Sequence, residues 1–164
     1  MKPGGNTVAP PEAGAATPSR RRASPAERRM SRELVLQGLY EALVASHEPA
    51  RIRLQIERED AFRRADQALF RELWSGIHQN RADLESAIAP MLDRALDEVS
   101  PIERSVLLLA TYELIHRVDI PFRVVINEAV ELTKAYGGTD GHKWINGVLD
   151  RFAPTVRPHE KRGC

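Results

Sequence analysis

Length, composition and charge restrict this sequence to a small globular protein with no obvious polyelectrolyte character. The chain has 164 residues, of which 42% are hydrophobic and 29% are charged, proportions typical of one soluble domain with a single core. Its 24 Lys and Arg nearly balance 23 Asp and Glu. The net charge of +1 therefore gives no global signal for nucleic acid, and any basic patch must be local.

The distribution of cysteine and of apolar residues indicates a cellular compartment. Cys164 is the only cysteine, which excludes an intramolecular disulfide and a thiolate metal cluster. No apolar run approaches the roughly 18 residues that span a bilayer, and residues 1–22 lack the apolar centre of a signal peptide. We therefore expect a cytoplasmic protein with no membrane association.

The first segment, residues 1–23, is rich in Gly, Pro and Ala and contains few large aliphatic side chains. Such a segment buries too little surface to offset the entropy of ordering, so we predict a disordered, basic, Pro-rich tail. Ser24-Pro25-Ala26-Glu27 has the pattern of a helix start, with a serine cap and proline at the first helical position. An apolar stripe at helical spacing carries this helix to about Leu43.

The middle of the chain has a weaker pattern. Residues 51–64 are charged with sparse apolar positions, which predicts a short helix or a mobile connection. From Asp66 an apolar stripe with helical spacing continues until Pro90, where proline interrupts the hydrogen-bond ladder.

The second half predicts three helices. Ser100-Pro101-Ile102-Glu103 is a second capping pattern, and the apolar residues after it cover more than one helical face, which indicates the central buried helix. The next helix begins at or near Pro121 and stops at Gly137-Gly138. No stretch shows sustained period-two alternation, so the sequence predicts an all-α fold.

The last helix has an apolar face that ends at Phe152. It should start near Thr139 or Asp140 and end before Pro154, because proline disfavours helical conformation in the residue before it. Residues 154–164 are then expected to form a flexible C-terminal tail.

Two motifs in the second half resemble the NusB family. Ile126-Asn127-Glu128-Ala129 and Asn146-Gly147-Val148-Leu149-Asp150 occur at the separation found in that family, and the opening helix is similar in its Arg28-Arg29 and Gln37-Gly38-Leu39-Tyr40. The resemblance covers roughly residues 28–158. It implies an all-α fold of about seven helices in two small bundles packed across one another, over residues 24–153.

The resemblance also implies a function. It indicates a non-catalytic transcription antitermination factor that binds boxA-type single-stranded RNA together with NusE, a small-subunit ribosomal protein, in an antitermination complex on RNA polymerase. No cofactor or metal is implied. The chain departs from the family in its long tail before Ser24, in Met30, which interrupts the arginine run, and in Gly141, which replaces the serine common before the His-Lys pair.

Eight residues form the predicted RNA-binding surface. Arginines at a helix N-terminus are disfavoured by the helix dipole, so their cluster favours a polyanionic partner. The glycine loop before a lysine offers backbone amides and a cation to phosphate oxygens, and nearby aromatic rings can stack on unpaired bases. The set is Arg28, Arg29, Arg32, Tyr40, Tyr136, Asp140, Lys143 and Trp144.

These residues also have ordinary structural interpretations. The arginines can form a solvated face, the glycines can end one helix before the cap of the next, and Tyr136 or Trp144 can belong to the core. Asp97, Glu98 and Glu103 surround the start of the central helix, where negative charge favours the dipole. Because the family directs this region toward its protein partner, we predict an acidic rim that contacts a basic ribosomal protein.

Other functions remain open. Five histidines show no metal-binding pairing, and no catalytic arrangement stands out. The chain could be the RNA-binding domain of an RNA methyltransferase, but the Gly-rich methyl-donor domain is absent from these 164 residues. It could also be a helical interaction protein whose homodimer hides the arginine face.

Overall fold

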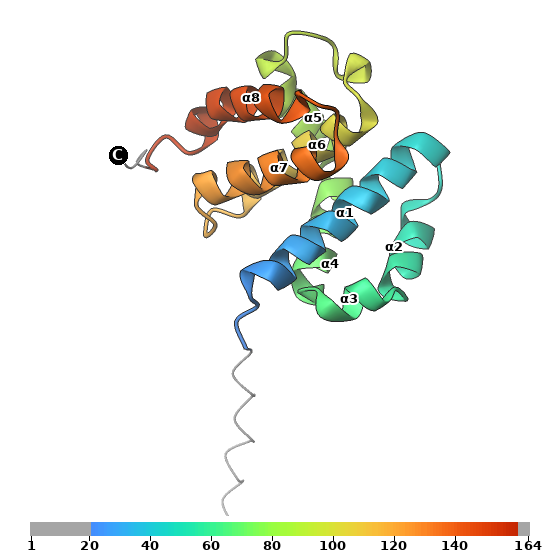
Figure 1. The fold of residues 1–164 in the computed structure, drawn as a ribbon. Helices are drawn as coiled ribbons and strands as arrows, with labels where there is room; N and C mark the ends of the chain where they lie inside the picture. Colours follow the sequence, from blue (N-terminus) through green and yellow to red (C-terminus); the bar gives the residue numbers. More distant parts are fainter. Residues whose placement is uncertain (1–20, 161–164) are drawn as a thin grey trace, which may run out of the picture.

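The computed structural model describes residues 21–160, and this part of the chain is helical (Figure 1). Residues 1–20 of the predicted tail (residues 1–23) and the last residues, 161–164, lie outside the described residues. Between residues 21 and 160 there are α-helices, two 3₁₀ turns and no strand, which confirms the all-α prediction. The elements are α1 Pro25–Ala45, α2 Pro49–Glu57, α3 Asp60–Arg64, α4 Gln67–Gln79, α5 Arg81–Ile88, η1 Ala89–Met91, η2 Leu96–Glu98, α6 Pro101–His116, α7 Phe122–Tyr136 and α8 Gly141–Val156.

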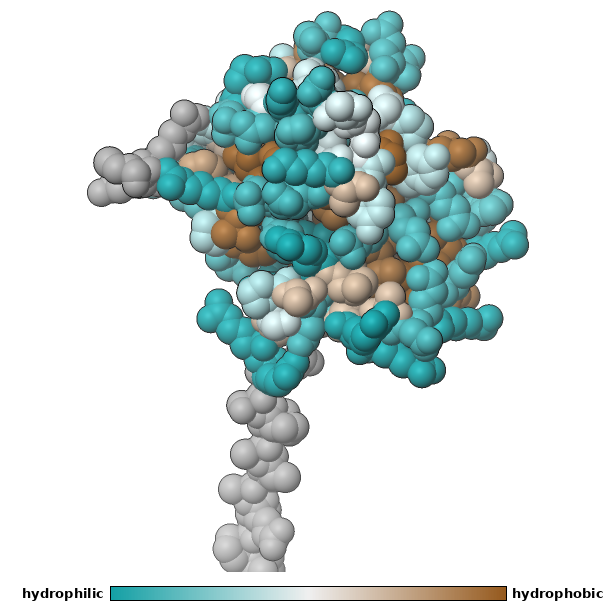
Figure 2. All heavy atoms as spheres, in the orientation of Figure 1, coloured by the Kyte–Doolittle hydropathy of each residue, from teal (hydrophilic) through white to brown (hydrophobic). Residues whose placement is uncertain are grey.

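The helices form two groups that meet along α1 and α6. Helices α1 to α4 lie together in one half, and α5 to α8 lie together in the other (Figure 1). Helix α6 packs against α1 and α4 on one side and against α5, α7 and α8 on the other. Hydrophilic side chains cover most of the face shown in Figure 2, with smaller hydrophobic patches between them.

Helix α1 begins at the predicted cap. The Ser24 hydroxyl accepts a hydrogen bond from the Glu27 amide at 3.1 Å, which satisfies one of the free donors of the first turn. The charged segment that follows α1 forms two short helices, α2 and α3, and both pack on α1 through buried Ile52, Ile56 and Phe62. Three apolar residues are therefore enough to order a segment for which a mobile connection was one expectation.

The apolar stripe after Asp66 belongs to two helices rather than one. Asn80 separates α4 from α5, and its side-chain amide donates to the Gly76 carbonyl at 2.7 Å. An asparagine side chain that bonds to the backbone competes with the helical ladder, which explains the break. Pro90 lies in η1, where the helical rhythm was expected to stop.

Helix α6 is the predicted central helix. Its Ser100 cap accepts from the Glu103 amide at 3.3 Å. Every residue from Ser105 to Leu114 is buried, including the acidic Glu113. Because this stretch has no solvent-facing stripe, the charged Glu113 carboxylate needs a partner inside the protein.

Helices α7 and α8 lie side by side and are joined by the glycine loop (Figure 1). Helix α7 ends at Tyr136 before Gly137, and α8 starts after Asp140, as predicted. The predicted end of α8 is wrong, because the helix continues through Pro154 to Val156. The proline removes one backbone N–H donor. Because α8 ends two residues later, the rest of the helix keeps its hydrogen bonds.

The residues after α8 pack against the core. Arg157 is 7% exposed, and its guanidinium donates to the carbonyl oxygens of Glu113, Leu114, Arg117 and Ile120 at 2.7–3.1 Å. These carbonyls lie at or just after the end of α6, where the helix leaves its acceptors unpaired. Residues 154–160 therefore do not form the flexible tail that the sequence predicted.

We predict that Arg157→Ala lowers the free energy of unfolding by about 3 kcal/mol, because it removes a buried guanidinium that donates to four backbone carbonyls, two of which have no backbone donor within residues 21–160. Denaturant unfolding measures the change. Arg151→Ala is the matched control: this exposed side chain donates one bond to the Met91 carbonyl at 3.1 Å, and its loss should cost less than about 1 kcal/mol. Equal stability of the two variants would contradict the capping role.

Candidate nucleic-acid interface

Arg29 lies at the surface where α1 meets α7. Its Nε and Nη2 donate to the two carboxylate oxygens of Glu128 at 3.0 and 2.9 Å, while half of its side chain stays exposed. The hydrogen bond from the guanidinium to Glu128 raises the pKa of Arg29 above its ordinary value. The pair therefore holds a permanent cation at the junction of the two halves of the protein.

Arg28 lies beside it at the start of α1. Its side chain is partly buried, and Nη1 donates to the Ala23 carbonyl. Two cations thus lie next to each other at the end of the first turn of α1. Both positions fit the predicted phosphate-binding role, which stays a prediction.

Tyr40 and Tyr136 come together in space although they are far apart in sequence. They are 40% and 51% exposed, and both line a pocket of about 400 Å³ between α1, α3, and the ends of α6 and α7. Glu33, Gln37 and Glu59 supply its polar groups. An exposed aromatic pair of this kind can offer stacking faces to unpaired bases.

The glycine loop presents its charged side chains to solvent. Lys143 and Asp140 form an ion pair at 3.4 Å, with about three quarters of each side chain exposed. Gly141 lies against the Glu103 carboxylate, and a Cβ at this position would collide with it. The glycine that replaces the family's serine therefore gives room to Glu103, which turns toward the N-terminus of α8.

Trp144 is half-buried and packs against the core. The Arg94 guanidinium lies over its ring, 4.9 Å from the ring centre, and is held by Asp93 at 3.0 and 3.3 Å. The indole therefore has a covered face as well as an exposed part. Trp144 thus combines features of a core residue and of an exposed stacking platform, the two interpretations that the sequence left open. In the same loop, Asp97 and Glu98 of the predicted acidic rim are exposed.

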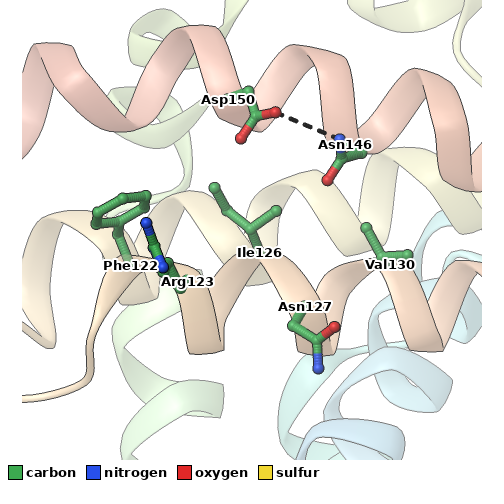
Figure 3. Close-up of a pocket in the computed structure, with 7 residues that line it drawn as sticks. All are labelled: Phe122, Arg123, Ile126, Asn127, Val130, Asn146 and Asp150. Atoms are coloured by element: carbon green, nitrogen blue, oxygen red, sulfur yellow. Dashed lines mark hydrogen bonds between the residues drawn. The ribbon is translucent and has the colours of Figure 1, made fainter. Parts of the chain in front are cut away.

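The family motifs line a groove that sequence reasoning did not identify as a site. The groove lies between α7 and α8 and has a volume of about 350 Å³ (Figure 3). Asn146 and Asp150 on α8 are joined by a 3.3 Å hydrogen bond and lie across from Ile126 on α7 (Figure 3). The sequence contained a signal for this groove, because Asn146 and Asp150 are four residues apart and therefore share a helical face.

Within the described residues, two features of other protein classes are absent. No helix has the length and apolar composition needed to cross a membrane. No three His, Cys, Asp or Glu side chains of residues 21–160 gather closely enough to hold a metal ion.

Comparison with known proteins identifies the family. Residues 29–154 match the sequence model of the NusB family. The chain belongs to the NusB family. It is 50% identical to the transcription antitermination protein NusB of Thiobacillus denitrificans over 133 residues, which cover 81% of this chain and 92% of that protein. It is 49% identical, with the same coverage, to the protein of that name from Burkholderia thailandensis.

Solved structures agree with this membership. NusB of T. maritima superposes with a TM-score of 0.68 at 32% identity, over 82% of this chain and 94% of that chain. A NusB chain in a complex with NusE and double-stranded RNA superposes with a TM-score of 0.69 at 21% identity, over 80% and 99% of the two chains. The second likeness shows the shared fold.

Arg32 differs from the other predicted RNA-binding residues. Its side chain is 3% exposed, and Nε donates to the Glu113 carboxylate at 2.9 and 3.2 Å. Burial raises the pKa of Glu113, and the Arg32 guanidinium opposes that rise. The expectation of an exposed phosphate contact at Arg32 is therefore corrected. Its position four residues before buried Leu36 is the signal that could have revealed this role.

We predict that Arg32→Ala lowers the free energy of unfolding by about 3–5 kcal/mol, because it leaves the Glu113 carboxylate buried without a counter-charge. Arg32→Met combined with Glu113→Leu should restore most of the loss, since neither charge is then buried. Chemical denaturation of the single and double variants tests both statements. Arg29→Ala should cost less than Arg32→Ala, because half of the Arg29 side chain is exposed, although its partner Glu128 is only 12% exposed. An Arg32→Ala variant as stable as Arg29→Ala would show that the buried pair is not required.

Proposed function

We propose that this protein is a non-catalytic transcription antitermination factor that binds boxA-type single-stranded RNA together with the ribosomal protein NusE, within an antitermination complex on RNA polymerase. Membership of the NusB family supports the proposal, as do the relatives of that name that share about half of its residues over most of the chain. A solved complex that contains NusB, NusE and RNA gives the fold a precedent for both partners.

The main structural support for the proposal is the arrangement of a cation and aromatic rings along α1. The exposed cation of Arg29 and the tyrosine-lined pocket lie along the same face of α1, because positions 29, 33, 37 and 40 follow helical spacing. A cation for phosphate oxygens beside aromatic rings for bases is the combination by which proteins bind unpaired RNA. Lys143 at the start of α8 adds a second exposed cation.

The acidic residues divide between two roles. Asp97 and Glu98 are exposed in η2 and can meet a basic protein partner without giving up a buried contact. Glu103 is half-buried against Gly141, so it contributes to the N-terminus of α8 instead of extending outward. We assign Asp97 and Glu98 to the partner-binding rim and Glu103 to the border between the two surfaces.

We predict that Arg28→Ala with Arg29→Ala weakens the binding of short single-stranded RNA and leaves the fold intact. Each lost phosphate contact should reduce the slope of log affinity against log salt by about 0.7, so the double variant should lose about 1.4. Arg51→Ala with Arg58→Ala is the control, because it removes the same charge from the exposed surface of α2 and its C-terminal cap. RNA titration over a range of salt concentrations measures the slope. Light scattering on the same samples, with and without RNA, tests whether the chain forms a homodimer that RNA dissociates. An unchanged slope in the Arg28/Arg29 variant would refute the proposed surface.

Trp144→Ala should cost about 1–3 kcal/mol of RNA affinity if the indole is a stacking platform, while Trp144→Phe should retain most of the binding. Its half-buried position adds a loss of folding stability that stays below the roughly 3–5 kcal/mol expected for a fully buried aromatic. RNA titration and denaturant unfolding of the same two variants separate these effects. Normal RNA affinity of the folded Ala variant would rule out stacking.

A further inference from the structure

The pocket between Tyr40 and Tyr136 has a chemistry unlike the cationic surface beside it. Besides its two tyrosines, its polar side chains are the carboxylates of Glu33 and Glu59 and the amide of Gln37. We propose that this pocket holds one unpaired nucleobase that carries an exocyclic amino group, and that Glu33 reads its amino edge. The inference rests on the proposed RNA-binding function and adds a base-specific site to it.

The acceptor oxygens of the pocket are available to a ligand. Glu59 accepts a hydrogen bond from Gln37 Nε2 at 3.1 Å through one oxygen, which leaves its second oxygen for another donor. The half-buried Glu33 side chain makes no hydrogen bond or ion pair with any residue in the described range 21–160. Carboxylates accept and do not donate, so the complementary ligand edge must carry N–H groups.

This requirement discriminates among the bases. Guanine presents an imino and an amino donor side by side, which match the two oxygens of one carboxylate, and cytosine and adenine each present one amino group. Uracil presents a single N–H group between two carbonyl oxygens, and a carboxylate repels these oxygens. A phosphate group is repelled as well, so the pocket selects a base edge and leaves the backbone to the arginines.

The two tyrosine rings complete the site for a planar ligand. They come from different halves of the protein, Tyr40 from α1 and Tyr136 from the end of α7, and both are partly exposed at the pocket. Burial, with a smaller contribution from the Glu33 carboxylate, raises the pKa of Tyr136, so its phenol stays neutral. Base stacking on such rings is sequence-tolerant, which leaves the choice of base to the carboxylates.

Glu33 also connects the pocket to the phosphate-binding side of the surface. It lines a smaller neighbouring pocket of about 150 Å³ together with Arg29 and Glu128. Glu131 lines this smaller pocket as well, so a phosphate group can contact Arg29 only on its exposed side, while the base lies in the pocket that the tyrosines line.

The test uses short oligouridine RNAs that carry a single guanosine, cytidine or adenosine, with the wild-type chain and the Glu33→Gln variant. We expect the wild type to prefer the guanosine-containing RNA over oligouridine. Replacement of guanosine by inosine, which lacks the amino group, should reduce that preference. Glu33→Gln should reduce it by roughly tenfold or more, the effect of losing one good base contact.

Glu131→Gln is the matched control. This substitution removes the same charge near Arg29. Glu131 lies outside the tyrosine-lined pocket and pairs with Lys134 at 3.4 Å. Its substitution should change the affinity for every RNA equally. An equal change for every RNA in Glu33→Gln would overturn the inference, because it would show a general charge effect.

A second pair of variants keeps the result interpretable if Glu33→Gln lowers stability. Tyr136→Ala should weaken binding of the guanosine-containing RNA, and Tyr136→Phe should retain it. Full binding by the Ala variant would overturn the site. RNA binding that depends on Arg28 and Arg29 but not on base identity would overturn the base-reading inference and leave the proposed function standing. A complete absence of RNA binding would overturn both.

Discussion

The buried ion pair between Arg32 and Glu113 determines how the two halves of this protein fit together. Helix α6 is enclosed on all sides, so its one buried carboxylate must be matched by a cation from a neighbouring helix. Arg32 on α1 supplies it through Nε at 2.9 and 3.2 Å. Either charge without the other would be far more costly than the intact pair. The contact therefore fixes the rotation of α1 about its own axis, and this rotation determines which residues of α1 face outward.

The surface follows from that rotation. With Arg32 and Leu36 directed inward, the adjacent stripe of Arg29, Glu33 and Tyr40 lies at the border of the core, where α1 meets α7. The Arg29–Glu128 pair then joins α1 to the family motif on α7. The pocket between Tyr40 and Tyr136 is thus a consequence of helix packing, and a change that loosens α1 would open the pocket as well as destabilise the fold.

Capping and glycine signals in the sequence predicted helix ends correctly, whereas the Pro154 signal and the long-range polar contacts were misjudged. The serine caps at Ser24 and Ser100 and the glycine stop after Tyr136 act within a few residues, so their patterns predicted the helix ends correctly. Arg32 was predicted as a surface cation and residue 157 as part of a flexible tail, because the Glu113 carboxylate lies 81 residues from Arg32 and the carbonyls that Arg157 binds lie more than 30 residues from it. A carboxylate within an apolar helix indicates that some cation must be buried, but it does not identify which one.

Two cations of the proposed RNA surface are already paired with carboxylates, Arg29 with Glu128 and Lys143 with Asp140. A phosphate group that binds either cation must replace an existing ion pair, so the net electrostatic gain per contact is smaller than for a free cation. The net charge of +1 gives no long-range attraction to offset this. The chain alone should therefore bind RNA weakly, and selective binding must come from base contacts and from a protein partner. This balance gives a physical reason for an RNA-binding protein of this composition to act within an assembly.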